Sequence, residues 1–203
     1  MTPRPITLRP DLDLIAHLVP GSSRVLDLGC GDGALLHHLM AEHDCTGTGV
    51  EIDPEKVLAA IAAGVPVMEL DLDADLQLFA AASYDTVVLS RTIQTIRRPE
   101  LVLREMARIG SRLIVSAPNF GLLQHRLMLL SGRMPMSREL PYSWYDTPNL
   151  RFTTLVDLED LFAKLGLVID QRINLSIAGE PVGKGFRAAN LRAGAAVYVL
   201  SQG

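Results

Sequence analysis

Three glycines follow a short apolar run in the segment Val25-Leu-Asp-Leu-Gly-Cys-Gly-Asp-Gly33. Glycine lets the main chain turn sharply and approach a ligand closely, because it has no Cβ atom. A helix that starts after such a turn offers unpaired N–H groups and the positive end of its dipole to a polar or anionic group. The segment therefore predicts a strand, a binding loop and a helix.

Two classes of ligand fit this loop. Gly29, Gly31 and Ala34 match the dinucleotide pattern G-x-G-x-x-A. Asp27 and the three glycines match the acid-x-G-x-G-x-G pattern of S-adenosylmethionine sites. Asp27 favours the second class, because a carboxylate there is poorly placed beside a pyrophosphate but can accept from an ammonium group. The alternative without a ligand is a tight turn between strand and helix.

Polar residues after later strands extend the candidate site. Glu51, which lies 18 residues beyond Gly33, can accept both ribose hydroxyls in either ligand class. Asp71 can accept the adenine amino group, although the nearby Asp73 and Asp75 complicate its assignment and a solvated strand end is the alternative. The complete predicted cofactor site consists of Asp27, Gly29, Cys30, Gly31, Gly33, Glu51, Ile52, Asp71, Leu72 and Ser90.

Gln94 and His125 are the candidate catalytic residues. Methyl transfer from a sulfonium is an in-line displacement in which positioning does much of the catalysis, so a missing base is weak evidence against an enzyme. Gln94, which lies shortly after Ser90, is a candidate to present a polar group to a substrate, with capping or packing as the alternative. His125 is a candidate general base. No metal site is predicted.

Strand-like and helix-like runs alternate between residues 11 and 118, which indicates a parallel sheet with helices on both faces. On the helix that starts at Glu55, core spacing predicts burial of Val57, Leu58 and Ile61. Thr154 and Asp157 form a variant capping box. The predicted strands are 24–28, 46–52, 65–70, 86–90, 113–116, 168–175 and 195–200.

Composition narrows the class of protein. The 203 residues are 48% hydrophobic, which favours a single domain over 1–203 with an N-terminal arm and helix over 1–22. A net charge of −4 argues against nucleic-acid binding. Two cysteines exclude a disulfide scaffold. No apolar run approaches the roughly 18 residues of a membrane span, and prolines interrupt the amino terminus, so a cytoplasmic protein without membrane contact is expected.

The segment 120–152, an insertion or lid before the sixth strand, concentrates five of the ten aromatic residues. It also contains four arginines and only two carboxylates. One alternative is that the segment is a lid whose rings complete the core. The other is that it forms a partner surface, because Tyr, Trp, Met and Arg are enriched at interface centres.

The chain resembles the class I S-adenosylmethionine-dependent methyltransferases over roughly residues 11–200. That resemblance implies a three-layer, doubly wound α/β fold with seven strands, mostly parallel, whose last strand is antiparallel and lies beside the fifth. The closer resemblance is to the methionine biosynthesis protein MetW family, through VLDLGCGDG, GVEID, SAPNFG, LRPDL, VLREMARIG and especially GRMPMSRELPYSWYDTPN. Arg91 and Arg151-Phe152 depart from the family pattern, where Gln and His-Leu are more usual.

The MetW resemblance implies a protein that binds S-adenosylmethionine or S-adenosylhomocysteine and supports a homoserine O-acyltransferase as its partner, with 120–152 as a possible partner surface. The alternative is a self-sufficient methyltransferase acting on a small molecule. A nucleotide-dependent dehydrogenase is a third class, against which Asp27 argues.

Overall fold

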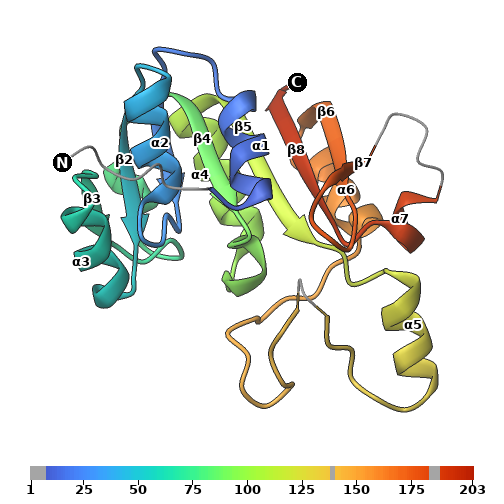
Figure 1. The fold of residues 1–203 in the computed structure, drawn as a ribbon. Helices are drawn as coiled ribbons and strands as arrows, with labels where there is room; N and C mark the ends of the chain where they lie inside the picture. The colour runs from blue at the N-terminus through green and yellow to red at the C-terminus, as the bar shows by residue number, and fades with distance from the viewer. Residues whose placement is uncertain (1–7, 138–139, 183–187) are drawn as a thin grey trace.

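One mixed sheet organises the computed structural model, which describes residues 8–137, 140–182 and 188–203 (Figure 1). The strands lie in the order β3-β2-β1-β4-β5-β8-β6-β7. Their bounds are β1 Arg24–Leu28, β2 Thr46–Glu51, β3 Val67–Glu69, β4 Tyr84–Ser90, β5 Gly110–Pro118, β6 Leu167–Leu175, β7 Pro181–Val182 and β8 Ala195–Gln202.

The first five strands are parallel, whereas β8 runs antiparallel between β5 and β6. This arrangement confirms the predicted doubly wound fold and the antiparallel strand beside the fifth. The sheet has eight strands rather than the predicted seven. The additional strand, β7, pairs only Asn174 with Val182 and Leu175 with Pro181, and two residues are too few to give an alternating pattern in the sequence.

Helices cover both faces of the sheet. The helices α1 to α3 pack on one face around Val25, Val88 and Ile114, whereas α4 and α6 pack on the other around Leu26, Val87 and Leu113. The helix bounds are α1 Pro10–Leu18, α2 Ala34–Glu42, α3 Pro54–Ala62, α4 Pro99–Ile109, α5 Leu123–Leu130, α6 Leu155–Lys164 and α7 Ala189–Arg192, with short 3-10 turns η1 Leu76–Leu78 and η2 Ile93–Thr95.

The predicted inner face of α3 is wrong in two positions. Val57 is buried, but Leu58 and Ile61 are 67% and 57% exposed, and Ala60 lies against the sheet instead. Ala60 is in close approach to Gly33, because a Cβ on that glycine would stand 3.2 Å from the Cβ of Ala60. Helix α3 therefore packs against the glycine loop through Ala60, a small residue.

The segment after β5 departs from the layers. Helix α5 and the chain that follows it lie beyond the carboxyl end of β5, away from the helices that cover the sheet (Figure 1). The chain returns to the body at α6, where the predicted cap is present in its variant form. Thr154 Oγ1 accepts from the Asp157 amide and donates to the Asp157 carboxylate at 2.7 Å. No helix in the described ranges has the length and apolar composition to cross a membrane.

Candidate functional site

The glycine loop is fastened to β2 at the carboxyl edge of the sheet. The amides of Gly29 and Cys30 both donate to the carbonyl of Val50, at 2.8 and 3.0 Å. Gly29, Gly31 and Gly33 all have positive φ, at 74°, 60° and 77°, a region that residues with a Cβ rarely adopt. The three glycines are therefore required by the backbone conformation itself.

The three glycines face different surroundings. A Cβ on Gly29 would stand 2.5 Å from Thr92 Oγ1, and one on Gly33 would stand 3.0 Å from Val65 Cγ2. A Cβ on Gly31 would meet no atom within 4 Å. The middle glycine thus presents bare backbone to open space, whereas its neighbours pack against protein. Cys30 also packs, because its sulfur lies where a Cβ on Gly49 would stand, and burial raises the pKa of its thiol.

The carboxylate of Glu51 joins the glycine loop to the end of β2. Its Oε2 accepts from the Gly31 amide at 2.9 Å, while its Oε1 accepts from the amides of Ile52 and Asp53 at 2.9 and 3.1 Å. Each carboxylate oxygen has two lone pairs, so Oε2 retains capacity for a ligand hydroxyl. The Ile52 side chain beside it is 60% exposed.

Asp27 is a buried carboxylate at the end of β1. It is 3% exposed, and none of the residues in the described ranges donates a hydrogen bond to it. Burial, with the nearby charge of Glu51 as a smaller cause, raises the pKa of Asp27 to about 7. Such a group needs a cationic or proton-donating ligand to be stable as a carboxylate.

Two arginines and a second buried carboxylate lie next to this pair. Asp11 of α1 is 2% exposed and pairs with Arg9 at 3.2 Å and with Arg91 at 3.0 Å. The charge of Arg9 partly offsets the rise in the pKa of Asp27. Arg91 follows β4 directly and has φ of 50°, a strained conformation for an arginine. Sequence reasoning missed this cluster, because Arg9 and Arg91 are far apart in the chain and no motif joins them.

The acidic residues after β3 have distinct roles. Asp73 accepts from the amides of Arg97 and Arg98, both at 2.9 Å, and so holds the two residues that precede α4. Asp75 accepts from the Asp71 amide at 2.8 Å. Asp71 Oδ1 accepts from the Asp73 amide at 2.9 Å, and Asp71 and the adjacent Leu72 are half-buried. Asp73 therefore joins two distant segments, whereas the hydrogen bonds of the Asp71 and Asp75 carboxylates stay within their own turn.

The remaining candidates lie near the ends of β4 and β5. Ser90 Oγ is 3.2 Å from Ser116 Oγ. The Gln94 carbonyl accepts from the amides of Leu150 and Arg151 at 2.8 and 2.9 Å, and its side-chain Oε1 is buried without a hydrogen-bond partner. The end of the segment 120–152 is therefore held at η2 by these two backbone hydrogen bonds.

Two aromatic rings pack against each other where the end of this segment lies. The rings of Phe120 and Phe152 lie 4.9 Å apart, and the Phe120 amide donates to the Thr153 carbonyl at 3.0 Å. The gap between Gln94, Phe120, Leu140 and their neighbours admits no more than about one water molecule. Phe120 and Phe152 therefore pack closely where the end of the segment 120–152 meets the residues after β5.

His125 is buried against Phe120, with the two ring centroids 5.7 Å apart. It is 1% exposed, its Nδ1 is 3.3 Å from the Phe120 carbonyl, and its buried Nε2 has no hydrogen-bond partner among the described residues. Burial lowers its pKa, which favours the neutral ring. Within the described ranges, no group of three or more potential ligands is placed to hold a metal ion.

The order of the strands and the glycine loop at the end of β1 define a class I S-adenosylmethionine-dependent methyltransferase fold. A methyltransferase from Mesorhizobium loti superposes with a TM-score of 0.69 at 17% identity, covering 96% of this chain and 98% of that one. One from Thermotoga maritima, described as a possible histamine N-methyltransferase, gives 0.68 at 20% identity, with 96% and 88% covered. At these identities the likeness establishes the fold alone.

The chain belongs to the methionine biosynthesis protein MetW family, whose model matches residues 9–200. The bifunctional methionine biosynthesis protein MetXA/MetW of Rhodopirellula baltica is 37% identical over 181 residues. The match covers 84% of this chain but 29% of that longer protein. The predicted family resemblance is confirmed.

The raised pKa of Asp27 predicts that this residue destabilises the folded protein at neutral pH. Between about pH 4 and 7 the unfolded chain releases a proton that the folded protein retains, so stability falls as pH rises and levels off above 7. We expect Asp27→Asn to raise the free energy of unfolding at pH 8 by about 2–4 kcal/mol and to have little effect at pH 4. Urea unfolding at both pH values measures this, with the exposed Asp32→Asn as control. Equal stability of Asp27→Asn and wild type at pH 8 would contradict it.

The hydrogen bonds of Asp73 predict a loss of stability when its carboxylate is removed. Asp73→Ala leaves the amides of Arg97 and Arg98, which precede α4, without their acceptor, and this should lower the free energy of unfolding by about 1–2 kcal/mol. Urea unfolding is the measurement, and the exposed Asp160→Ala on α6 is the control. A loss no larger than that of the control would show that water replaces the cap.

Proposed function

We propose that this chain binds S-adenosylmethionine or S-adenosylhomocysteine at the glycine loop and serves as a cofactor-responsive partner of a homoserine O-acyltransferase. The observation that carries the proposal is the end of the segment 120–152, where the amides of Leu150 and Arg151 donate to the carbonyl of Gln94, in the turn that packs on the glycine loop. The bifunctional MetXA/MetW relative supports it, because its name places two methionine biosynthesis functions in one chain.

The residues around Gly31 fit the methionine and ribose parts of the cofactor. Asp27 is buried, has no donor among the described residues and can accept from the α-ammonium group. Glu51 has remaining lone pairs for the ribose hydroxyls. The open space at Gly31 allows the ligand to approach the backbone. Arg9 and Arg91 bring positive charge that suits the cofactor carboxylate.

The next residues along the sheet edge fit the adenine. Asp71 can accept from the exocyclic amino group, with the Leu72 amide as a donor to the ring. The exposed Ile52 side chain offers an apolar surface for the ring face. Ser90, at the end of β4, borders the point where the strand order reverses, the usual ligand position in open α/β sheets.

Close packing after β5 supports a partner role over methyl transfer. When bound, S-adenosylmethionine supplies an electrophilic methyl group, and a small-molecule acceptor needs space beside it. In this fold the region between strands five and six borders that space, and here the gap among Gln94, Phe120, Phe152 and their neighbours has room for about one water molecule. The candidate base His125 is buried against Phe120.

A continuous set of contacts supports a response to the cofactor. Thr92 packs directly on Gly29 of the binding loop. Thr92 and Gln94 belong to the same short turn, and the Gln94 carbonyl holds Leu150 and Arg151. A ligand that shifts the loop therefore acts on the end of the segment 120–152 through residues in contact. Coupling of this kind is reciprocal, so the partner also changes cofactor affinity.

The proposed cofactor site predicts that Asp27→Ala and Glu51→Ala each weaken the binding of S-adenosylhomocysteine. We expect a loss of about 1–3 kcal/mol, the scale for hydrogen bonds to charged groups, when affinity is measured by isothermal titration calorimetry. The exposed Glu55→Ala on α3 is the matched carboxylate control and should bind as wild type. Unchanged affinity in both site variants would assign a purely structural role to the loop.

The partner role predicts a complex with the homoserine O-acyltransferase of the same organism. We expect the two purified proteins to co-elute, and acyltransferase activity to rise in the presence of the chain and to change with S-adenosylhomocysteine. Absence of a complex and of any activity change at micromolar concentrations would contradict this role. Transfer of a labelled methyl group to a product in cell extract would favour the methyltransferase alternative instead.

A further inference from the structure

Asp27 and Glu51 lie on neighbouring strands and on the same face of the sheet. The parallel register of β1 and β2 sets Asp27 beside Gly49, and Glu51 lies two residues further along β2, where side chains return to that face. Asp27 and Glu51 are only 3% and 7% exposed. Two buried acidic groups therefore share one small region at the carboxyl edge of the sheet.

The two carboxyl groups differ in their hydrogen-bond donors. Glu51 accepts from three backbone amides, and such donors favour the ionised form of a carboxyl group. Asp27 has no donor among the described residues. Its neighbours across the sheet are Gly49, which has no side chain, and Val88, which is apolar. The negative charge therefore resides on Glu51, and the Asp27 carboxyl holds the proton.

The other charged groups around Asp27 do not reverse this division. Arg9 favours the ionised form of Asp27, but its effect is smaller than those of burial and of the neighbouring carboxylate. Arg9 also pairs with Asp11, as Arg91 does, and this pairing offsets part of the positive charge. The Cys30 thiol in the glycine loop stays neutral, because burial raises its pKa. The balance raises the pKa of Asp27 to about 7.

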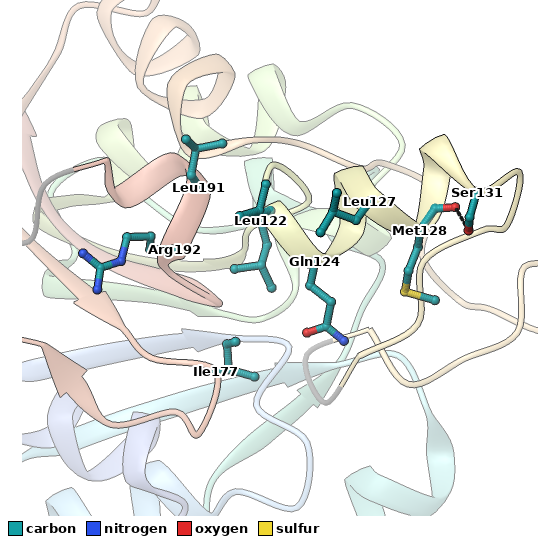
Figure 2. Close-up of a pocket in the computed structure, with 9 residues that line it drawn as sticks. Leu122, Gln124, Leu127, Met128, Ser131, Ile177, Leu191 and Arg192 are labelled. Carbon is teal, nitrogen blue, oxygen red and sulfur yellow. Dashed lines mark hydrogen bonds between the residues drawn. The ribbon is translucent and has the colours of Figure 1, made fainter.

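The ammonium end of the proposed cofactor needs a counter-charge, which a second hollow of the molecule does not offer. The hollow between α5 and α7 has a volume of about 610 Å³, and none of the nine residues that line it in the described part of the chain is acidic (Figure 2). At the glycine loop, a Cβ on Gly31 would meet no atom within 4 Å, so a ligand can approach the loop backbone. The ammonium group therefore fits at the Asp27 carboxyl.

We propose that a proton on Asp27 competes with the ammonium group of S-adenosylmethionine or S-adenosylhomocysteine, so that binding releases this proton and weakens in acid. The inference rests on the proposed cofactor site and adds the condition under which that site is filled. On binding, the O–H bond of the Asp27 carboxyl breaks and its proton passes to water. The carboxylate then accepts an N–H of the ammonium group, which keeps its own three protons.

The direction of the pH dependence follows from the reciprocity of binding equilibria. An ammonium group stabilises ionised Asp27 and so lowers the pKa of Asp27 in the complex, and ionisation of Asp27 raises cofactor affinity to the same extent. Affinity is therefore weakest in acid, rises as the pH approaches 7 and levels off above it. Through this group the chain would respond to pH as well as to the cofactor.

Isothermal titration calorimetry of the full chain with S-adenosylhomocysteine tests the proposal. Titrations at pH 6.5 in buffers of different ionisation enthalpy count the protons released for each ligand bound. We expect release of about 0.7 proton, because roughly three-quarters of Asp27 is protonated in the free protein at that pH. The Kd should be about five- to tenfold lower at pH 7.5 than at pH 6.0.

Two variants separate Asp27 from other titrating groups. Asp27→Asn removes the ionisable group at nearly constant side-chain size, so we expect almost no proton release and a Kd that changes less than about twofold between pH 6.0 and 7.5. Glu55→Gln, at an exposed carboxylate on α3, is the matched control and should release protons as wild type does.

The outcomes distinguish this inference from the proposed function. Binding to wild type without proton release at pH 6.5 would overturn the inference and leave the proposed cofactor site intact. Proton release that persists in Asp27→Asn would have the same meaning. Absence of binding to wild type at pH 7.5 would overturn both. The wild-type proton count decides alone where Asp27→Asn binds too weakly to titrate.

Discussion

The carboxylate of Glu51 accepts hydrogen bonds from three backbone amides, those of Gly31, Ile52 and Asp53. This interaction joins the glycine loop after β1 to the turn after β2, so it fixes the position of Gly31, the glycine of that loop that faces open space. It also places a negative charge beside Asp27, where burial already disfavours ionisation. The geometry of the loop and the electrostatics of the candidate site therefore depend on the same side chain.

Arg9 and Arg91 counter the accumulation of acidic groups. Both pair with the buried Asp11, so α1 is tied to the end of β4 beside the glycine loop. Arg91 adopts a left-handed backbone conformation directly after β4. Strain of this kind persists where the surroundings hold it, and it concentrates at binding sites. Arg9, which directly precedes α1, is thus part of the candidate site.

Local patterns predicted the parts of this protein that depend on local chemistry. The alternation of strands and helices, the positive-φ glycines and the cap at Thr154 all follow from residue type and spacing. The prediction was wrong for Leu58 and Ile61, because close approach to the glycine loop selects Ala60 for the inner face of α3. The Asp11 cluster and the hydrogen bonds from Arg97 and Arg98 to Asp73 depend on contacts between distant segments, which spacing does not reveal.

The segment 120–152 shows how one stretch of chain meets two physical requirements. Its last residues must satisfy the carbonyl of Gln94 and bury Phe152 against Phe120, which fixes them beside the cofactor side of the sheet. Its first helix is free of that requirement and leaves leucines exposed beside α7. The end of the segment is thus bonded to Gln94, in the turn whose first residue, Thr92, packs on Gly29 of the glycine loop. Under the proposed function, this contact is the place where a bound cofactor would act on the end of the segment 120–152.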